Sequence, residues 1–88
     1  MKAPVYTTRF KREFALMLSR GKDEAEFANI AARLLNNAPL EPRHRDHPLI
    51  GSWIGWRDCH LEPDWLLIYK ATATEVIFAR TGTHSDLF

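Results

Sequence analysis

The stretch Trp65-Leu66-Leu67-Ile68-Tyr69-Lys70 contains an unbroken apolar run of five residues, a length that no run in this 88-residue sequence exceeds. Successive side chains of a β-strand point to opposite faces, so a strand that is apolar at every position needs cover on both faces. Five apolar residues are far too few to cross a membrane. The run therefore predicts a strand over residues 65–70 in the centre of a sheet.

Two further extended segments flank this central strand. Residues 51–61 are rich in aromatic side chains and lead into the turn Glu62-Pro63-Asp64. A second turn over residues 71–74 leads into a strand over 75–81, which Gly82 ends. Residues 83–88 remain as a short tail. The second half of the chain thus predicts three consecutive strands.

The first half reads differently. Val5 to Thr8 is rich in strand formers, and the following apolar residues recur at helical spacing over 9–19. Asp23, followed three residues later by Glu26, resembles a capping box and opens a second helix. The buried stripes of the two helices are expected at Phe10, Phe14, Met17 and Leu18, and at Phe27, Ile30, Ala31, Leu34 and Leu35.

The short link between the two helices predicts an antiparallel hairpin, and residues 38–45, with Pro39 and Pro42, predict a loop. The order β-α-α-β-β-β indicates an α+β domain. We expect a helical hairpin packed on one face of a mainly antiparallel four-stranded sheet. A chain of this length forms one domain, here residues 1–88.

Composition limits the class of protein. The single cysteine, Cys59, excludes an internal disulfide framework, and the N-terminus has no signal-peptide pattern, so we expect a cytoplasmic protein without membrane contact. Net charge is +1, but residues 1–45 hold nine basic and five acidic residues, net +4, whereas 46–88 hold three and six, net −3. The basic half is suited to positioning phosphate groups, or simply gives the helices a soluble surface.

Four titratable residues fall at the breaks between the predicted strands: His47, His60, Asp64 and His84. Imidazoles exchange protons near neutral pH, and a carboxylate can orient or stabilise a protonated imidazole. If the last strand pairs with the central one, His84 returns to the end of the sheet that carries His60 and Asp64. These four residues are the candidate catalytic set.

Each of the four also has a structural interpretation. His47 is followed by a proline and suits a turn, His60 suits a half-buried core position, Asp64 suits a turn cap, and His84 suits a solvated tail. Two other chemistries are weaker. A Cys59/His60 nucleophilic pair fails because neighbours in a strand point to opposite faces. A zinc site at His44, His47 and His60 lacks a second recognisable ligand pair.

Three more residues are candidates for contact with a nucleic acid. Arg80 lies in an apolar strand, where its guanidinium needs a carboxylate partner or a phosphate. Trp65 adjoins Asp64 and is either core or a stacking platform for a base. Phe88, at the end of the chain, either tucks into the sheet or holds an unstacked base.

Three motifs in the second half carry a family resemblance: D-H-P-L-x-G-x-W over 46–53, H-x-E-P-D-W-L-L-I-Y-K over 60–70, and R-T-G-T-H over 80–84. Together they closely resemble the YafQ branch of the RelE-like toxins, the mRNA interferases of bacterial type II toxin–antitoxin modules. Residues 1–45 match only in layout. Trp56 and Cys59 depart from the family pattern, at positions where tyrosine and a small residue are expected.

The resemblance implies a microbial-RNase-like fold that cuts mRNA in the decoding site of the ribosome, inhibits translation and is silenced by a cognate antitoxin. It carries the catalytic roles to His47, His60, Asp64 and His84. It carries RNA contacts to Arg80 and Phe88. The alternative is an inactive module of the same fold that only binds its antitoxin and represses, and a metal-binding regulatory domain is a more distant one.

Elementary chemistry agrees with the resemblance. RNA cleavage needs a base for the 2′-OH proton, an acid for the leaving 5′-oxygen and positive charge for the transition state, without a metal or other cofactor. His84 is the first choice for the acid. His47 or His60 serves as base or charge stabiliser, with Asp64 orienting one histidine, and the sequence does not separate these roles.

Overall fold

The predicted central strand is the third of five in a single sheet with the order β1-β5-β4-β3-β2. The computed structural model describes residues 1–88, and its strands are β1 (Ala3–Tyr6), β2 (His47–Pro48), β3 (Arg57–Glu62), β4 (Trp65–Ala71) and β5 (Glu75–Gly82). β1 pairs parallel to β5, and the other three pairings are antiparallel. The α+β class is confirmed. The expected four strands become five because His47-Pro48 adds a short edge strand.

Two helices form the predicted hairpin, α1 (Thr8–Ser19) and α2 (Glu24–Leu35). Thr7 caps the first, and its hydroxyl accepts from the Phe10 N–H at 3.0 Å. Asp23 caps the second by accepting from the Ala25 N–H at 2.9 Å. The reciprocal half of the expected capping box does not form. The Asp23 N–H instead donates to Glu62 at 3.1 Å, which ties the start of α2 to the end of β3.

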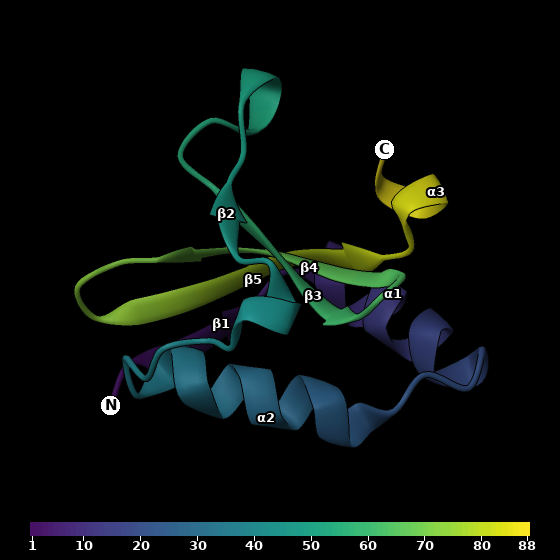
Figure 1. Cartoon of the computed structure of the whole chain (residues 1–88), viewed down its shortest axis with the longest axis horizontal. Helices are drawn as coiled ribbons and strands as arrows, with labels where there is room; N and C mark the ends of the chain where they lie inside the picture. The colour runs from purple at the N-terminus through teal and green to yellow at the C-terminus, as the bar shows by residue number, and fades with distance from the viewer.

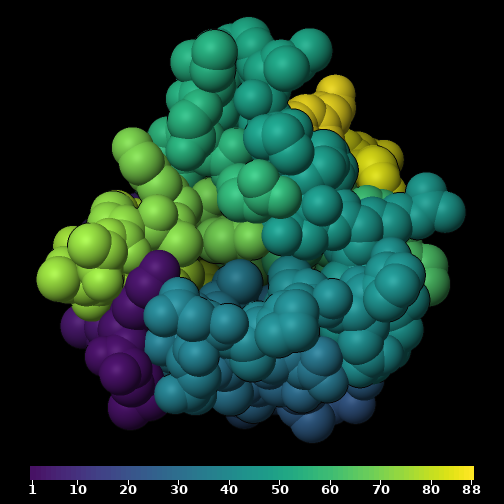
Figure 2. Space-filling view, turned by 60° about the vertical axis from the view of Figure 1, so that its left-hand side comes forward, coloured from purple at the N-terminus to yellow at the C-terminus, as the bar shows by residue number.

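The hairpin covers one face of the sheet, while the β2–β3 loop and the C-terminal turn lie on the other side (Figure 1). Between hairpin and sheet lies an aromatic core that includes Phe10, Met17, Phe27, Ile30, Trp65, Leu67, Tyr69 and Phe78. In Figure 2 the blue α2 and the purple N-terminal strand cover the lower part of the surface, and the teal β2–β3 segment forms the top. Both faces of β4 are covered, as its uninterrupted apolar sequence predicts.

The structure adds a short turn to the predicted loop and corrects the sequence-based expectation at two other segments. The segment 38–45 contains a 3-10 turn, η1 (Pro42–His44). Residues 51–61 are extended only from Arg57 onward, because a second 3-10 turn, η2 (Gly51–Trp53), precedes β3. The predicted tail coils into a one-turn helix, α3 (His84–Leu87). Each element spans four residues or fewer, too short for a periodic pattern to reveal. No helix in the structure has the length and apolarity needed to cross a bilayer.

Candidate active site

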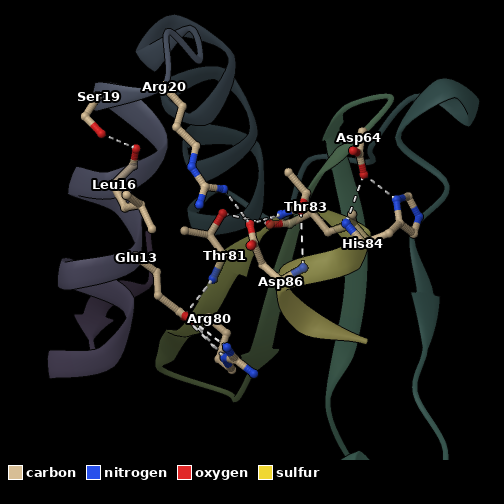
Figure 3. Close-up of polar contacts among 11 residues, drawn as sticks. Glu13, Leu16, Ser19, Arg20, Asp64, Arg80, Thr81, Thr83, His84 and Asp86 are labelled. Atoms are coloured by element: carbon tan, nitrogen blue, oxygen red, sulfur yellow. Dashed lines mark hydrogen bonds and ion pairs between the residues drawn. The ribbon is translucent and has the colours of Figure 1, made fainter.

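One rim of the sheet gathers three of the candidate residues. β3 ends there, the turn at Pro63-Asp64 follows, β4 begins, and β5 arrives antiparallel to β4 and passes into α3. This topology brings His60, Asp64 and His84 together although 24 residues of sequence separate the first from the last. Figure 3 shows Asp64 reaching across to His84 at the start of α3.

Asp64 makes two contacts with His84 through the same carboxylate oxygen. Its Oδ1 accepts from the His84 backbone N–H at 2.9 Å and lies 2.6 Å from the His84 Nδ1. The backbone bond and then the side-chain bond lower the pKa of Asp64, so it is ionised at neutral pH and acts only as an acceptor. Nδ1 of His84 therefore carries the hydrogen. Nε2 is left to take or give a proton, which is the arrangement that acid–base catalysis uses.

His60 lies beside His84 with the two ring centroids 5.3 Å apart and the planes at 70°. Partial burial lowers the pKa of His60, and the nearby His84 and Arg45 add to this effect. The neutral imidazole of His60 thus faces the imidazole of His84, whose tautomer Asp64 fixes. Both rings line an open hollow of about 490 Å³ together with Arg43, Arg45 and Pro63.

His47 belongs to a neighbouring cluster. Its Nδ1 lies 2.7 Å from the Arg45 carbonyl oxygen, which can only accept, so Nδ1 carries the hydrogen and Nε2 is free. That Nε2 lies 3.7 Å from Asp58 Oδ2. The preceding residue, Asp46, is held by Arg57 at 3.2 Å and by the Tyr69 hydroxyl at 2.6 Å, which anchors the chain as it enters β2.

Asp58 contacts His47 and lies near enough to His84 for their charges to interact, so it lies between the two clusters of candidate residues. The sequence analysis did not assign Asp58 to the site. It pairs across the sheet with His47 on one side and Ile68 on the other, so all three side chains share a face. Only 3% of Asp58 is exposed, and its Oδ1 has no hydrogen-bond partner. Burial raises the pKa of Asp58 to about 6, although the charges of His47 and His84 act in the opposite direction. An aspartate inside a strand, two positions before a candidate histidine, was the available signal.

The raised pKa of Asp58 makes a prediction about stability. Its folded value of about 6 exceeds the 3.8 of an unperturbed side chain, so the folded protein binds more protons between those two values. Stability contributed at Asp58 therefore falls as pH rises from about 4 to about 6 and stays lower above that range. Asp58→Asn should be more stable than wild type at pH 7 by an amount on the order of 2 kcal/mol.

Urea unfolding of both proteins at pH 4, 5, 6 and 7 measures this difference. The gap between variant and wild type should widen across the series and then level off. A gap that stays constant with pH would show that burial of the carboxylate is not the cause. Asp46→Asn, which changes a partly exposed carboxylate of the same cluster, serves as the comparison.

Arg80 lies on the same face, because it pairs with Ile68 across β4 and β5. Its guanidinium is bound by Glu13 of α1: the Nε lies 3.2 Å from both carboxylate oxygens, and Nη2 makes a further short contact. Glu13 also accepts from the Thr81 N–H at 3.4 Å. Thr81 lies on the part of the β5 edge that β1 leaves unpaired, since β1 pairs only with residues 75–78. The carboxylate partner that the sequence left open for Arg80 is therefore Glu13. Arg80, the residue predicted to bind a phosphate, is thus already neutralised by Glu13 in this structure (Figure 3).

Two RNA-contact expectations have different outcomes. Trp65 is wholly buried, with an exposed fraction of 0%, and stacks on Phe14 within the core. Its ring offers no face to a base, so the stacking role is corrected to a packing role. Phe88 is 66% exposed, and its ring is accessible at the end of α3. The zinc site considered at His44, His47 and His60 does not form, because His44 is buried and its Nδ1 accepts from the Glu41 N–H at 3.1 Å.

Gly82 sets how closely α3 approaches the sheet. A Cβ at this position would lie 2.9 Å from the Asp86 Cβ and 3.3 Å from the Leu87 Cδ2. Asp86 in turn is bound by Arg20 at 2.9 Å, which ties α3 to the end of α1. The small residue therefore lets α3 sit where His84 can reach Asp64.

Gly82→Ala is expected to push α3 away from β5 and so to displace His84. A misplacement of about 1 Å can lower a rate about 10²-fold, so we expect a loss of RNA cleavage of that order with a much smaller effect on unfolding. Ser85→Ala, at an exposed position of the same helix, is the control and should keep wild-type activity. A fully active Gly82→Ala protein would mean that α3 has no fixed place in the site.

Known proteins are similar to this chain over nearly its whole length. A family model described as the bacterial toxin of type II toxin–antitoxin system, YafQ, matches residues 2–88. The chain belongs to the YafQ toxin family. The mRNA interferase toxin YafQ of Escherichia coli K12 is 45% identical over 84 residues, which are 94% of this chain and 91% of the relative. The family resemblance and the enzyme class predicted from the sequence, an endoribonuclease, are confirmed.

Solved YafQ structures have the same fold. YafQ from E. coli BL21(DE3) superposes with a TM-score of 0.93 at 42% identity, covering 100% of this chain and 99% of the other. The toxin of an E. coli DinJ–YafQ toxin–antitoxin complex gives a TM-score of 0.90 at 43% identity, covering 99% and 97%. The fold predicted from the YafQ resemblance is therefore confirmed.

Proposed function

We propose that this YafQ family member cleaves mRNA on the ribosome by metal-independent acid–base catalysis at the rim that carries His60, Asp64 and His84. The observation that carries the proposal is the Asp64–His84 contact of 2.6 Å beside the ring of His60. It places two imidazoles, one of them with a fixed tautomer, over one hollow. Such a pair can act on the two oxygens that exchange protons during RNA cleavage.

The reaction begins with attack of the 2′-OH on the adjacent phosphorus. A base removes the 2′-OH proton, the bond to the 5′-oxygen breaks, and the acid protonates that oxygen. The products are a 2′,3′-cyclic phosphate and a 5′-hydroxyl. We assign the base to His60, because its lowered pKa keeps it neutral at pH 7. We assign the acid to His84, whose Nε2 can deliver a proton while Asp64 holds Nδ1.

His47 and Asp58 support the charge balance of the site. His47 Nε2 faces the buried carboxylate of Asp58, so a proton on His47 would gain an ion pair. We propose that His47 helps to stabilise the charged transition state. Arg80 contributes there only if it shares its guanidinium between Glu13 and the phosphate. Phe88, which is exposed at the end of α3 and whose N–H donates to the His84 carbonyl at 2.9 Å, is the proposed contact for an unstacked base.

The ribosome is the proposed setting of the reaction, which places the protein in the cytoplasm. A net charge of +1 offers little general attraction for free RNA, so the ribosome would hold the mRNA and present it to the rim. A cognate antitoxin is the proposed inhibitor, by analogy with the E. coli toxin that is bound to DinJ. The basic first half of the chain, net +4, suits an acidic antitoxin segment.

Tightly controlled expression in bacteria tests the proposed function. Wild type should arrest growth and create new mRNA 5′ ends at a fixed position within codons, and co-expression of the antitoxin should prevent both. A protein that arrests growth without new 5′ ends would be a binding toxin. If it changes neither growth nor mRNA, the inactive co-repressor becomes the better interpretation.

A further inference from the structure

Arg45 has an unusual backbone conformation. Its φ of 48° and ψ of 42° lie in the left-handed region, where a residue with a side chain is strained by about 1–2 kcal/mol. The only other non-glycine residue with positive φ is Asn37, a type that tolerates this region well. An arginine gains nothing from this backbone geometry. Strain of this kind is often retained where the side chain has a function.

The side chain of Arg45 lines the hollow of the active site. Two arginines, two histidines and Pro63 form its wall, and no carboxylate is among them. Arg43 is paired with Glu41 at 3.2 Å, whereas Arg45 makes no ion pair or side-chain hydrogen bond. Its positive charge acts on His60, whose pKa it helps to lower. The hollow therefore contains a free guanidinium beside two imidazoles, and its volume falls in the usual range for ligand sites.

Arg45 is also fixed in place by its own backbone. Its N–H donates to the Pro42 carbonyl at 3.1 Å, and its carbonyl accepts from His47 Nδ1 at 2.7 Å. One residue thus connects the η1 turn, His47 and the hollow. Arg80 differs, since Glu13 already binds its guanidinium. Among the arginines on this side of the sheet, Arg45 is the one that can bind an anion without first breaking an ion pair.

We propose that Arg45 forms a phosphate-binding subsite, which holds an mRNA backbone phosphate adjacent to the one that is cleaved. The proposal rests on the proposed function and adds the group that fixes the position of the strand. A guanidinium binds phosphate oxygens through two parallel N–H donors, and such charge-assisted bonds also set orientation. Because His60 and His84 line the same hollow, the phosphate held there belongs to the RNA strand that passes them.

Arg45→Asn tests the subsite without disturbing the fold, because asparagine tolerates the left-handed region. Its stability to urea should equal or exceed that of wild type. Its affinity for a 2′-O-methyl RNA hexanucleotide, which cannot be cleaved, should fall about tenfold. The slope of log affinity against log salt should become smaller by about 0.7, the value for one phosphate contact on single-stranded RNA. Arg45→Lys should recover part of the affinity, because it keeps the charge.

Arg12→Gln is the matched control, since it removes an exposed, unpaired arginine from α1. It should bind the hexanucleotide like wild type. Equal effects of the two variants would overturn the subsite and indicate only general electrostatic attraction. No loss with Arg45→Asn would overturn it as well.

Single-turnover cleavage on programmed ribosomes is the second readout. The protein concentration for half-maximal rate should rise about tenfold for Arg45→Asn, with a smaller change in the maximal rate. If that concentration rises while hexanucleotide binding is unchanged, the phosphate belongs to ribosomal RNA and the mRNA subsite is wrong. If wild type binds the hexanucleotide through Arg45 but cuts no mRNA, the proposed function fails and the subsite stands.

Discussion

His84→Ala should lower the rate of mRNA cleavage by about 10²–10⁴-fold, the usual contribution of a positioned acid or base. The side chain of His84 is 54% exposed and contributes nothing to the core, so the variant should fold like wild type. Single-turnover cleavage of mRNA on ribosomes measures the rate, and circular dichroism with urea unfolding checks the fold. The effect is expected on the maximal rate more than on binding, because the proton transfer belongs to the transition state.

Asp64→Asn is the companion variant. Asparagine keeps the size of the side chain but removes the negative charge that fixes the Nδ1–H form of His84. We expect a smaller loss than for His84→Ala, together with a changed pH dependence of the rate. Combining the two substitutions should give no further loss, since Asp64 acts through His84. Independent, additive losses would contradict that coupling.

Trp65→Ala should destabilise the protein by about 3–5 kcal/mol, the range for removing a large buried aromatic side chain. Total stabilities of small domains are only about 5–15 kcal/mol, so we expect a large fraction of the variant to be unfolded near body temperature in growth assays. The indole is fully buried and contacts Phe14, which joins α1 to β4. Urea unfolding gives the measurement, and Trp65→Phe, which fills most of the space, is the control.

This pair of variants separates packing from RNA contact. If Trp65 is a core residue, the loss of cleavage should follow the unfolded fraction and Trp65→Phe should stay close to wild type. Trp65→Ala with wild-type stability but defective RNA binding would show that the ring reaches the RNA after all.

The sequence predicted the long elements well, because their patterns repeat. The run at residues 65–69 marked the central strand, and the helical stripes placed both helices to within a residue or so of α1 and α2. Short elements were missed for a physical reason. β2 forms through pairing with β3, which local preference does not encode. α3 has a local signal, the capping box of Thr83 and Asp86, but it is a single turn, too short for a periodic pattern to reveal. The parallel pairing of β1 with β5 also depends on the whole fold.

The site was predictable in its residue types but not in its pairings. The histidines and Asp64 were visible as titratable residues at strand ends, whereas the choice of His84 over His60 as the partner of Asp64 needed the β5–α3 geometry. Asp58 was missed because its burial comes from strands on both sides. Arg45 was missed because a left-handed backbone at an arginine has no signature in sequence.

The most direct test of the central claim is the chemistry of the cut ends. Purified protein is added to the same mRNA, either naked or bound to programmed ribosomes, at physiological salt. No divalent-metal requirement of the toxin itself is assumed. We expect cleavage on the ribosome alone, at one codon-phased position, with a 2′,3′-cyclic phosphate and a 5′-hydroxyl, and none with His84→Ala. Robust cleavage of the naked mRNA, or a 5′-phosphate at the cut, would contradict it.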